Sequence, residues 1–374
     1  MTVLGLATAA VLLWQSLVLL QNVRYRRLRA REDRPTDASL RTADAPLRIS
    51  VLIPARNEVH NLPRLIACLN AQKLPAAEII VCDDASEDGT TEWLAANAPD
   101  AGFAWFQAEA KPVGWMGKCW ACDQLGARAA GEWLLFLDAD MEPGPEFLLR
   151  LSANLAVTDA QMVTAGPCIT PTGVGDGTLI AIIPFVVLSM LPLNLAERSP
   201  NPAHCFANGQ AIAFRREDYL RLRPHEQVRA EVLEDVNLAR FVKGGGETVR
   251  IVDAVDCLQA HMYDSTSAAI AGFAKNSVAI CRSVPRAVAV ALIMPALYLL
   301  PLAWAAWTAD PLGLVLVGWT ALLFGATSRM AGLPRWYGLL YPLAFVLAEV
   351  TLLRSIVWNL KGNVMWKGRA YPTR

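Results

Sequence analysis

Between residues 46 and 286, short and continuously apolar runs alternate with longer amphipathic segments. The short runs predict strands that are buried on both faces, at 48–54, 78–82, 103–106 and 133–137. The longer segments have helical spacing, at roughly 58–72, 88–98 and 118–130. Alternation of strands and helices predicts an α/β fold with a mostly parallel central sheet and right-handed crossovers.

Longer apolar runs lie on either side of this region. Residues 3–20 carry no charge, and five arginines follow within eight residues, between 24 and 31. A secretory signal peptide has its positive charge before the apolar core, so this order predicts an uncleaved anchor whose N-terminus lies outside. Runs 287–307 and 312–328 predict a membrane hairpin. We therefore expect a multi-pass protein of the bacterial cytoplasmic membrane, with residues 46–286 on the cytoplasmic side.

Two further apolar runs have an ambiguous relation to the membrane. The run 337–357 contains Glu349 and Arg354 and has basic residues at both ends, so crossing the membrane and lying at its surface both remain open. The run 179–195 contains two prolines, and a single crossing there would separate the acidic motifs on its two sides. We expect it to be an interfacial or re-entrant segment, with a buried core helix as the alternative.

Composition narrows the functional classes. The 374 residues are 54% hydrophobic and carry a formal net charge of zero, so no whole-chain field would attract nucleic acid. Among the eight cysteines only Cys119 and Cys122 have CxxC spacing, with no second CxxC and no nearby histidine pair. A zinc site is therefore not expected, and these thiols are predicted to lie on a helix in a reducing compartment.

The predicted strands end in chemically active residues. Ligands of open α/β sheets bind beyond the carboxyl ends of the strands. The polar and special residues at these ends, with one later acidic pair that begins a helical stretch, are Pro54, Arg56, Glu58, Asp83, Asp84, Asp138, Asp140, Glu234 and Asp235. Several carboxylates at one sheet edge are costly unless cations or hydrogen-bond donors balance them. The pattern therefore predicts a ligand site that contains a cation.

These acids suit the transfer of a group from a nucleotide diphosphate. Asp138 and Asp140 form a D-x-D pair that suits Mg²⁺ or Mn²⁺ bound against phosphates, although isolated pairs of this kind also occur as solvated loops. Asp235 is the candidate general base that deprotonates an acceptor hydroxyl, and Glu234 is the alternative. A simpler role for this acid pair is a favourable interaction with the helix dipole.

Three more residues are candidates for contacts with the donor, and two of them have two interpretations. Asp84 is expected to accept a hydrogen bond from the nucleobase or ribose, while Asp83 either takes this role instead or caps the following turn. Lys118 is expected to contact donor phosphate or sugar, and the alternative is a solvated lysine at a helix start.

In this order the motifs resemble the family-2 glycosyltransferases, which have the nucleotide-sugar-binding GT-A fold. The matching segments are VLIPARNE (51–58), VCDDASEDGT (81–90), GWMGKCWAC (114–122), FLDAD (136–140), NGQAIAFRREDY (208–219) and VLEDVNLAR (232–240). The resemblance implies a UDP-sugar donor bound by Asp84, a metal and ribose site at Asp138 and Asp140, and Asp235 as base. It also implies that the nucleotide-sugar site includes Pro54, Arg56, Glu58, Gly209 and Gln210.

A narrower resemblance is to the membrane-bound carotenoid glycosyltransferases, such as those that act on chlorobactene or diaponeurosporenoate. It rests on the GWxGKxWAC segment, AGFAKN (271–276) and the ending WKGRAY (366–371). By this likeness Trp366, Lys367 and Arg369 return to the donor site. The QxxRW motif of processive synthases is missing from the corresponding region around Arg282, which favours the transfer of a single sugar.

The leading hypothesis is an inverting enzyme that moves one hexose, expected to be glucose, from a UDP-sugar to the hydroxyl or carboxyl of a membrane lipid such as a carotenoid. The alternatives are a polyprenyl-phosphate or hopanoid or glycolipid glycosyltransferase, and a non-catalytic nucleotide-sugar-binding membrane protein. The predicted domains are an anchor, a basic linker, a cytosolic GT-A domain, C-terminal membrane segments and a basic tail, at 1–23, 24–45, 46–286, 287–358 and 359–374.

Overall fold

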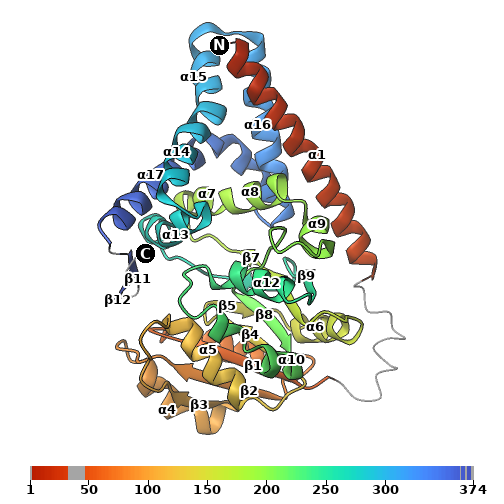
Figure 1. Cartoon of the computed structure of the whole chain (residues 1–374), viewed down its shortest axis with the longest axis vertical. Helices are drawn as coiled ribbons and strands as arrows, with labels where there is room; N and C mark the ends of the chain where they lie inside the picture. The colour runs from red at the N-terminus through yellow and green to blue at the C-terminus, as the bar shows by residue number, and fades with distance from the viewer. Residues whose placement is uncertain (1, 33–46, 363, 367–368, 372–374) are drawn as a thin grey trace. The chain divides into compact units, whose positions relative to one another are not determined.

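The computed structural model describes residues 2–32, 47–362, 364–366 and 369–371. The chain divides into two compact units, which we call the sheet unit and the helical unit (Figure 1). The sheet unit comprises Tyr25–Cys168 and Leu193–Ala260. The helical unit comprises Met1–Arg24, Ile169–Pro192 and His261–Arg374. Both units are discontinuous in sequence, because the segment 169–192 interrupts the sheet unit and belongs to the helical unit.

A seven-stranded sheet of order β3-β2-β1-β4-β8-β6-β9 forms the centre of the sheet unit. Its strands are β1 (Ile49–Ala55), β2 (Glu78–Asp83), β3 (Ala104–Gln107), β4 (Trp133–Leu137), β6 (Met162–Gly166), β8 (Ala211–Arg215) and β9 (Val249–Asp253). Strand β8 pairs antiparallel with β4 and β6, and the other pairs that we describe are parallel. The predicted α/β fold with a mostly parallel sheet is confirmed.

The apolar runs that predicted strands lie where expected, with one difference in burial. Strand β4 is buried along its whole length, and Val51, Leu52 and Ile53 of β1 are fully buried. Burial of each such side chain contributes ~1.5–3 kcal/mol. The prediction that residues 103–106 form a strand buried on both faces is wrong in its burial. Strand β3 is an edge strand with partly exposed side chains, because only β2 pairs with it.

Helices cover this sheet, and a small second sheet completes the unit (Figure 1). The helices are α3 (Leu62–Asn70), α4 (Thr90–Ala101), α5 (Gly117–Arg128), α6 (Phe147–Ala156), α9 (Leu193–Arg198), α10 (Arg216–Leu222), α11 (Pro224–Gln227) and α12 (Glu234–Gly244). The second sheet, of order β5-β10-β7, contains β5 (Met141–Pro143), β10 (Leu258–Ala260) and β7 (Cys168–Ile169). Cys119 and Cys122 lie on α5, which confirms the predicted helix, and both side chains are buried.

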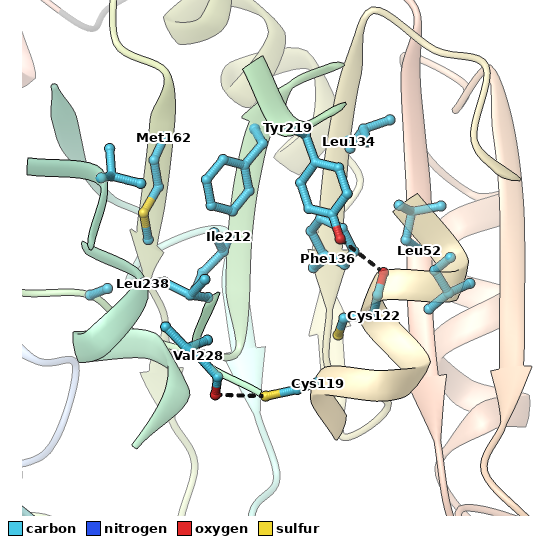
Figure 2. Packing of buried hydrophobic residues seen from close by; sticks show 14 of the residues in the cluster. Leu52, Cys119, Cys122, Leu134, Phe136, Met162, Ile212, Tyr219, Val228 and Leu238 are labelled. Carbon is cyan, nitrogen blue, oxygen red and sulfur yellow. Dashed lines mark hydrogen bonds between the residues drawn. The ribbon is translucent and has the colours of Figure 1, made fainter. Parts of the chain in front are cut away.

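The core beneath α5 fixes the position of that helix. Figure 2 shows Leu52, Phe136 and Ile212 of the sheet facing side chains of α5 and α12. Tyr219 donates a hydrogen bond to the Cys122 carbonyl oxygen at 3.1 Å (Figure 2). Gly126 allows this approach, since a Cβ there would lie 2.1 Å from the Tyr219 ring. The start of α5, which carries Lys118, is therefore held by close packing farther along the helix.

The helical unit contains the long apolar helices. Its elements are α1 (Thr2–Glu32, to Arg24 only), α7 (Val174–Ile180), α8 (Ile182–Met190), α13 (Thr266–Cys281), α14 (Val284–Tyr298), α15 (Leu300–Thr308), α16 (Pro311–Met330), η1 (Arg335–Leu340), α17 (Tyr341–Leu360), β11 (Val364–Trp366) and β12 (Arg369–Tyr371). Four segments of the described chain are long and apolar enough to cross a membrane: 3–29, 284–308, 311–330 and 335–360. Their length and composition indicate membrane association.

Aromatic side chains form the interior of this unit. Phe185 of α8 packs within 5.2–5.7 Å, centroid to centroid, of rings from α14, α16 and α17. The polar side chain of Asn22 on α1 donates to the carbonyl oxygens of Leu188 and Leu191 at 2.9 and 2.8 Å. Residues 179–190 of the apolar run 179–195 therefore lie in short helices of this unit, while residues 193–195 begin α9 of the sheet unit. The relation of the run to a membrane surface stays a prediction.

Candidate active site

The turn after β2 shows how the first acidic pair is used. We call Asp83, Asp84, Ser86 and Thr91 the β2-end cluster. Asp83 is fully buried, and its Oδ1 accepts from the Ser86 amide at 3.1 Å and the Ser86 hydroxyl at 2.5 Å. Its Oδ2 accepts from the Thr91 hydroxyl at 2.5 Å. Of the two roles predicted for Asp83, this geometry favours the cap of the turn, and it leaves Asp84 as the nucleotide-binding candidate.

Arg56 connects the ends of β1 and β2. Its Nη1 donates to the carbonyl oxygens of Asp84 and Ala85 at 2.6 and 2.7 Å. Asn57 and Ala85 both have positive φ, of 55° and 53°, a conformation that non-glycine residues adopt rarely. Such backbone conformations persist where surrounding contacts enforce them, and they are common at ligand sites. The two loops therefore form one ordered edge.

The other predicted residues of this edge have local contacts. Pro54 lies inside β1, in register with Cys82 of β2. Glu58 donates from its amide to the Thr90 hydroxyl at 2.9 Å, and its Oε2 accepts from Asn61 Nδ2 at 2.7 Å. Glu58 thus links the β1 loop to the start of α4, which gives it a structural role beside any contact with a donor.

A second cluster surrounds a lysine, and we call Lys118, Asp138, Gly209 and Glu234 the lysine cluster. Lys118 Nζ lies 2.7 Å from Asp138 Oδ1, 3.0 Å from Glu234 Oε1 and 3.1 Å from the Gly209 carbonyl oxygen. Burial disfavours the charge of this lysine, but Asp138 and Glu234 raise its pKa well above the ordinary value. The cluster therefore joins four separate segments of the chain through one ammonium.

Asp235 lies beside the lysine cluster at the start of α12. Its Oδ2 accepts from the Gly209 amide at 3.0 Å, and its Oδ1 accepts from the Val236 amide at 2.7 Å. Burial, followed by the charge of Glu234, raises the pKa of Asp235 to about 6. A carboxyl with such a pKa is a competent proton acceptor near neutral pH. Gly209 makes this arrangement possible, because a Cβ there would lie 3.1 Å from Asp235 Cβ.

The D-x-D turn follows β4 directly. The Asp138 amide donates to the Gln210 carbonyl oxygen at 2.9 Å, so this turn and the β8 entrance are joined. Gln210 is 6% exposed, and its Nε2 has no hydrogen-bond partner among the described residues. A buried amide donor of this kind is costly unless a ligand oxygen accepts from it. Gln210 therefore marks a place for a polar ligand beside Asp138.

The donor set fits a hard divalent cation that takes further ligands from substrate. Asp138 and Asp140 supply carboxylate oxygens from one turn. Within the described residues no group of three or more histidines, cysteines or acids is placed to hold an ion. Mg²⁺ and related ions commonly bind through one or two carboxylates plus substrate phosphates.

The contacts of Tyr219 and His225, which pack beside α5, were not predicted from the sequence. His225 Nδ1 lies 2.9 Å from the Tyr219 hydroxyl, and burial lowers the pKa of His225 to about 3. This imidazole is therefore neutral and serves packing and hydrogen bonding. No pattern in the sequence indicates that His225 lies near the helix that carries Lys118. Its partner Tyr219, however, belongs to the NGQAIAFRREDY segment.

Part of the basic stretch after the anchor is paired within the sheet unit, which was also not predicted. Arg26 forms an ion pair with Asp253 of β9, and Arg29 forms one with Glu197 of α9. Tyr25 donates to Glu197 Oε2 at 2.5 Å. Two of the five arginines are therefore neutralised by acids from distant segments.

Two of the three predicted tail residues have a described backbone. Trp366 pairs with Arg369 in the antiparallel hairpin of β11 and β12, while Lys367 lies outside the described residues. Strand β11 packs against α13, the helix that contains AGFAKN.

Residues 50–222 match the family described as Glycosyl transferase family 2. A 4,4'-diaponeurosporenoate glycosyltransferase of Staphylococcus haemolyticus is 28% identical over 206 residues, which are 54% of this chain and 52% of that protein. An undecaprenyl-phosphate mannosyltransferase of Micrococcus luteus is 29% identical over 113 residues, which are 30% of this chain and 46% of that protein. The chain thus spans about half the length of these curated relatives.

Among solved structures, a mannosyltransferase from Pyrobaculum calidifontis in complex with GDP-Man and Mn²⁺ has a similar fold, with a TM-score of 0.55. It is 18% identical, and the superposition covers 96% of this chain and 99% of that one. At this identity the likeness concerns the fold alone. The likeness shows a GT-A fold, and residues 50–222 are similar to the family-2 glycosyltransferases.

Proposed function

We propose that this protein is an inverting glycosyltransferase that moves one hexose from a UDP-sugar to a lipid acceptor in the membrane. The observation that carries the proposal is the placement of Asp235 beside the lysine cluster, with its pKa raised to about 6. Three features suit this reaction: a carboxylate that can act as base, hydrogen-bond donors that can bind phosphate, and long apolar helices. The match to a diaponeurosporenoate glycosyltransferase supports a carotenoid acceptor, through a hydroxyl or carboxyl. Glucose is the sugar that we propose.

In the proposed reaction Asp235 takes the proton of the acceptor hydroxyl. The acceptor oxygen forms a bond to the anomeric carbon of the sugar while the bond from that carbon to the diphosphate breaks. Glu234 is held by Lys118 at 3.0 Å, which leaves Asp235 as the base of the acid pair. The products are the glycosylated lipid and UDP, and the anomeric configuration inverts.

The donor is proposed to lie along the edge built from the loops after β1, β2 and β4. Asp84 would accept from the nucleoside, while Arg56 orders the backbone around it. Gln210 Nε2 would donate to a sugar or phosphate oxygen, and Lys118 would pair with the diphosphate. Pro54, Glu58 and Gly209 shape this edge and complete the proposed site, with Asp83 supporting its turn.

A divalent cation is proposed to be held by Asp138 and Asp140 together with the donor diphosphate. When bound, such a cation neutralises the charge that develops on the leaving phosphate. The complex of the Pyrobaculum mannosyltransferase with Mn²⁺ supports a cation in this fold. The tail residues Trp366, Lys367 and Arg369 are proposed to contact the donor, as the resemblance to carotenoid glycosyltransferases implies.

The location that we propose is the bacterial cytoplasmic membrane, with residues 46–286 on the cytoplasmic side. The arginines after the first apolar helix support this orientation. The run 179–195 is proposed to lie at the membrane surface, where a lipid acceptor is accessible. An acceptor dissolved in the bilayer requires a site near that surface.

The test is product formation by the full chain in lipid. Labelled UDP-glucose with Mg²⁺ or Mn²⁺ would be offered with carotenoid, hopanoid, sterol, diacylglycerol and polyprenyl phosphate in parallel. We expect a labelled lipid that disappears in the Asp235→Asn variant. Binding of the donor with no labelled lipid in any arm, across several nucleotide sugars, would contradict the proposal.

A polyprenyl phosphate is the second candidate acceptor, because a match to an undecaprenyl-phosphate mannosyltransferase supports it. A phosphate oxygen is already ionised and needs little help from a base. In that case Asp235→Asn would keep most of the activity with polyprenyl phosphate, which separates the two candidates in a single assay.

A further inference from the structure

The Lys118 ammonium is saturated by the groups around it. Both oxygens of Asp138 lie within hydrogen-bond distance of Nζ, at 2.7 Å for Oδ1 and 3.0 Å for Oδ2. Glu234 Oε1 at 3.0 Å and the Gly209 carbonyl oxygen at 3.1 Å complete the shell. A lysine has three N–H donors, so these acceptors use its whole capacity.

This arrangement competes with a metal ion for the same carboxylate. A cation bound to Asp138 would stand within a few ångströms of a positive charge that already contacts both of its oxygens. At a separation of about 4 Å, like charges near a protein surface repel each other strongly. Without a nucleotide, a divalent ion would therefore bind weakly, because Lys118 already occupies the Asp138 carboxylate.

The ammonium is also able to leave. The Lys118 side chain is 35% exposed, compared with 26% for Asp138 and 16% for Glu234. It extends from the first turn of α5 on a flexible four-carbon stem. A nucleoside diphosphate offers stronger anionic oxygens than one carboxylate, so it would draw the ammonium away from Asp138.

We propose that Lys118 acts as an internal counter-cation that occupies Asp138 in the ligand-free protein and gives up this carboxylate to a divalent metal only when a nucleoside diphosphate binds. The inference rests on the proposed function in one respect, the assignment of Asp138 as a metal ligand. It follows that nucleotide and metal bind cooperatively. By linkage, each raises the affinity for the other by the same factor.

The experiment measures Mn²⁺ binding by electron paramagnetic resonance, using the purified full chain with and without UDP. Without UDP we expect Lys118→Met to bind Mn²⁺ at least about tenfold more tightly than the unmodified protein. Lys118→Arg keeps the positive charge and should bind as weakly as the unmodified protein. The matched control is Lys73→Met, which removes another lysine paired with a carboxylate, Glu146 at 2.6 Å on the surface.

With UDP present, the difference between Lys118→Met and the unmodified protein should shrink. Equal or weaker Mn²⁺ binding by Lys118→Met without UDP would overturn the inference, provided that Asp138→Asn abolishes binding in both proteins. If Asp138→Asn leaves Mn²⁺ affinity unchanged in both proteins, the metal assignment itself fails and the inference falls with it. Should Lys118→Met not fold, Lys118→Gln removes the charge with a polar side chain and carries the same expectation.

Discussion

The β2-end cluster and the lysine cluster are both acidic strand ends, yet they are held together in opposite ways. Asp83 is satisfied by neutral donors that follow it closely in sequence, the Ser86 amide and hydroxyl and the Thr91 hydroxyl at the start of α4. Asp138 is balanced by a charge from Lys118, which lies on another element. Local neutral partners complete a turn, whereas a charged partner from a distant segment leaves a carboxylate able to exchange partners.

This difference predicts where substitutions act. A carboxylate whose partners are neutral and nearby contributes to the stability of the fold. A carboxylate with a mobile charged partner contributes to binding and reaction. Paired substitutions in the two clusters should therefore separate stability from activity.

Asp235→Asn should give the largest effect on activity. Removal of a general base typically lowers the rate by ~10²–10⁴-fold. The ionised carboxylate of Asp235 does not stabilise the fold, because the pKa of Asp235 is raised from its ordinary 3.8 to about 6. A raised carboxyl pKa makes the ionised form unfavourable in the fold, a cost present above pH 6 and absent below pH 4. Asn has one acceptor oxygen for the Gly209 and Val236 amides, so one amide loses its partner and this loss offsets the gain from removing the charge. The melting temperature at pH 7.5 should therefore change little, and a large fall would contradict this account.

Asp83→Ala should show the opposite result. The change leaves two partly buried hydroxyls and an amide without their acceptor, which costs about 1–3 kcal/mol. The melting temperature should fall, while the initial rate per folded molecule changes by less than about threefold. Retained stability with a large loss in donor affinity would instead make Asp83 a nucleotide ligand.

The pH dependence should sharpen the comparison further. Because the base must be deprotonated, kcat/KM should fall as the pH drops below about 6, the pKa of Asp235. Glu234→Gln removes the neighbouring negative charge and should move this limb to lower pH, with Lys118 still facing the pair. Rates measured from pH 4.5 to 8 test this, and a limb that stays in place would exclude Glu234 as a cause.

Gly209→Ala should affect activity much less than Asp235→Asn, with little effect on stability. Its Cβ would lie 3.1 Å from Asp235 Cβ and 3.4 Å from Glu234 Oε1, so the acids must shift by a few tenths of an ångström. A misplacement of this size should lower kcat by about threefold to tenfold with little loss of stability. Gly244→Ala in α12 is the control, since its Cβ would be 3.8 Å from Pro202.

The sequence predicted much of the fold and the identity of the acidic residues. It did not predict which groups donate hydrogen bonds to them or compensate their charge. Strands β4 and β2 were predicted from the apolar runs WLLFL and EIIVC, because buried parallel strands are continuously apolar. The choice between Asp83 and Asp84 could not be made, since it depends on which hydroxyls a turn brings within 3 Å. The contact between Lys118 and Glu234 was equally hidden, because residues 118 and 234 meet only through the completed sheet.

Exposure and long-range pairing were the other limits. The apolar letters of 103–106 gave no sign that β3 lies at an edge, because a strand's position depends on the order of the whole sheet. The arginines after the anchor predicted orientation from their number alone. Their pairing with Glu197 and Asp253 required the positions of α9 and β9.

The strand order has a consequence for how the chain is made. Strand β8 inserts between β4 and β6, yet it is synthesised after both and after the apolar segment 169–192. A nascent chain that ends before residue 211 therefore carries β4 and β6 with unpaired edges while apolar helices are already emerging from the ribosome. Such edges favour aggregation. Early delivery to the membrane insertion machinery, or a chaperone that shields β4 and β6, would protect this protein during translation.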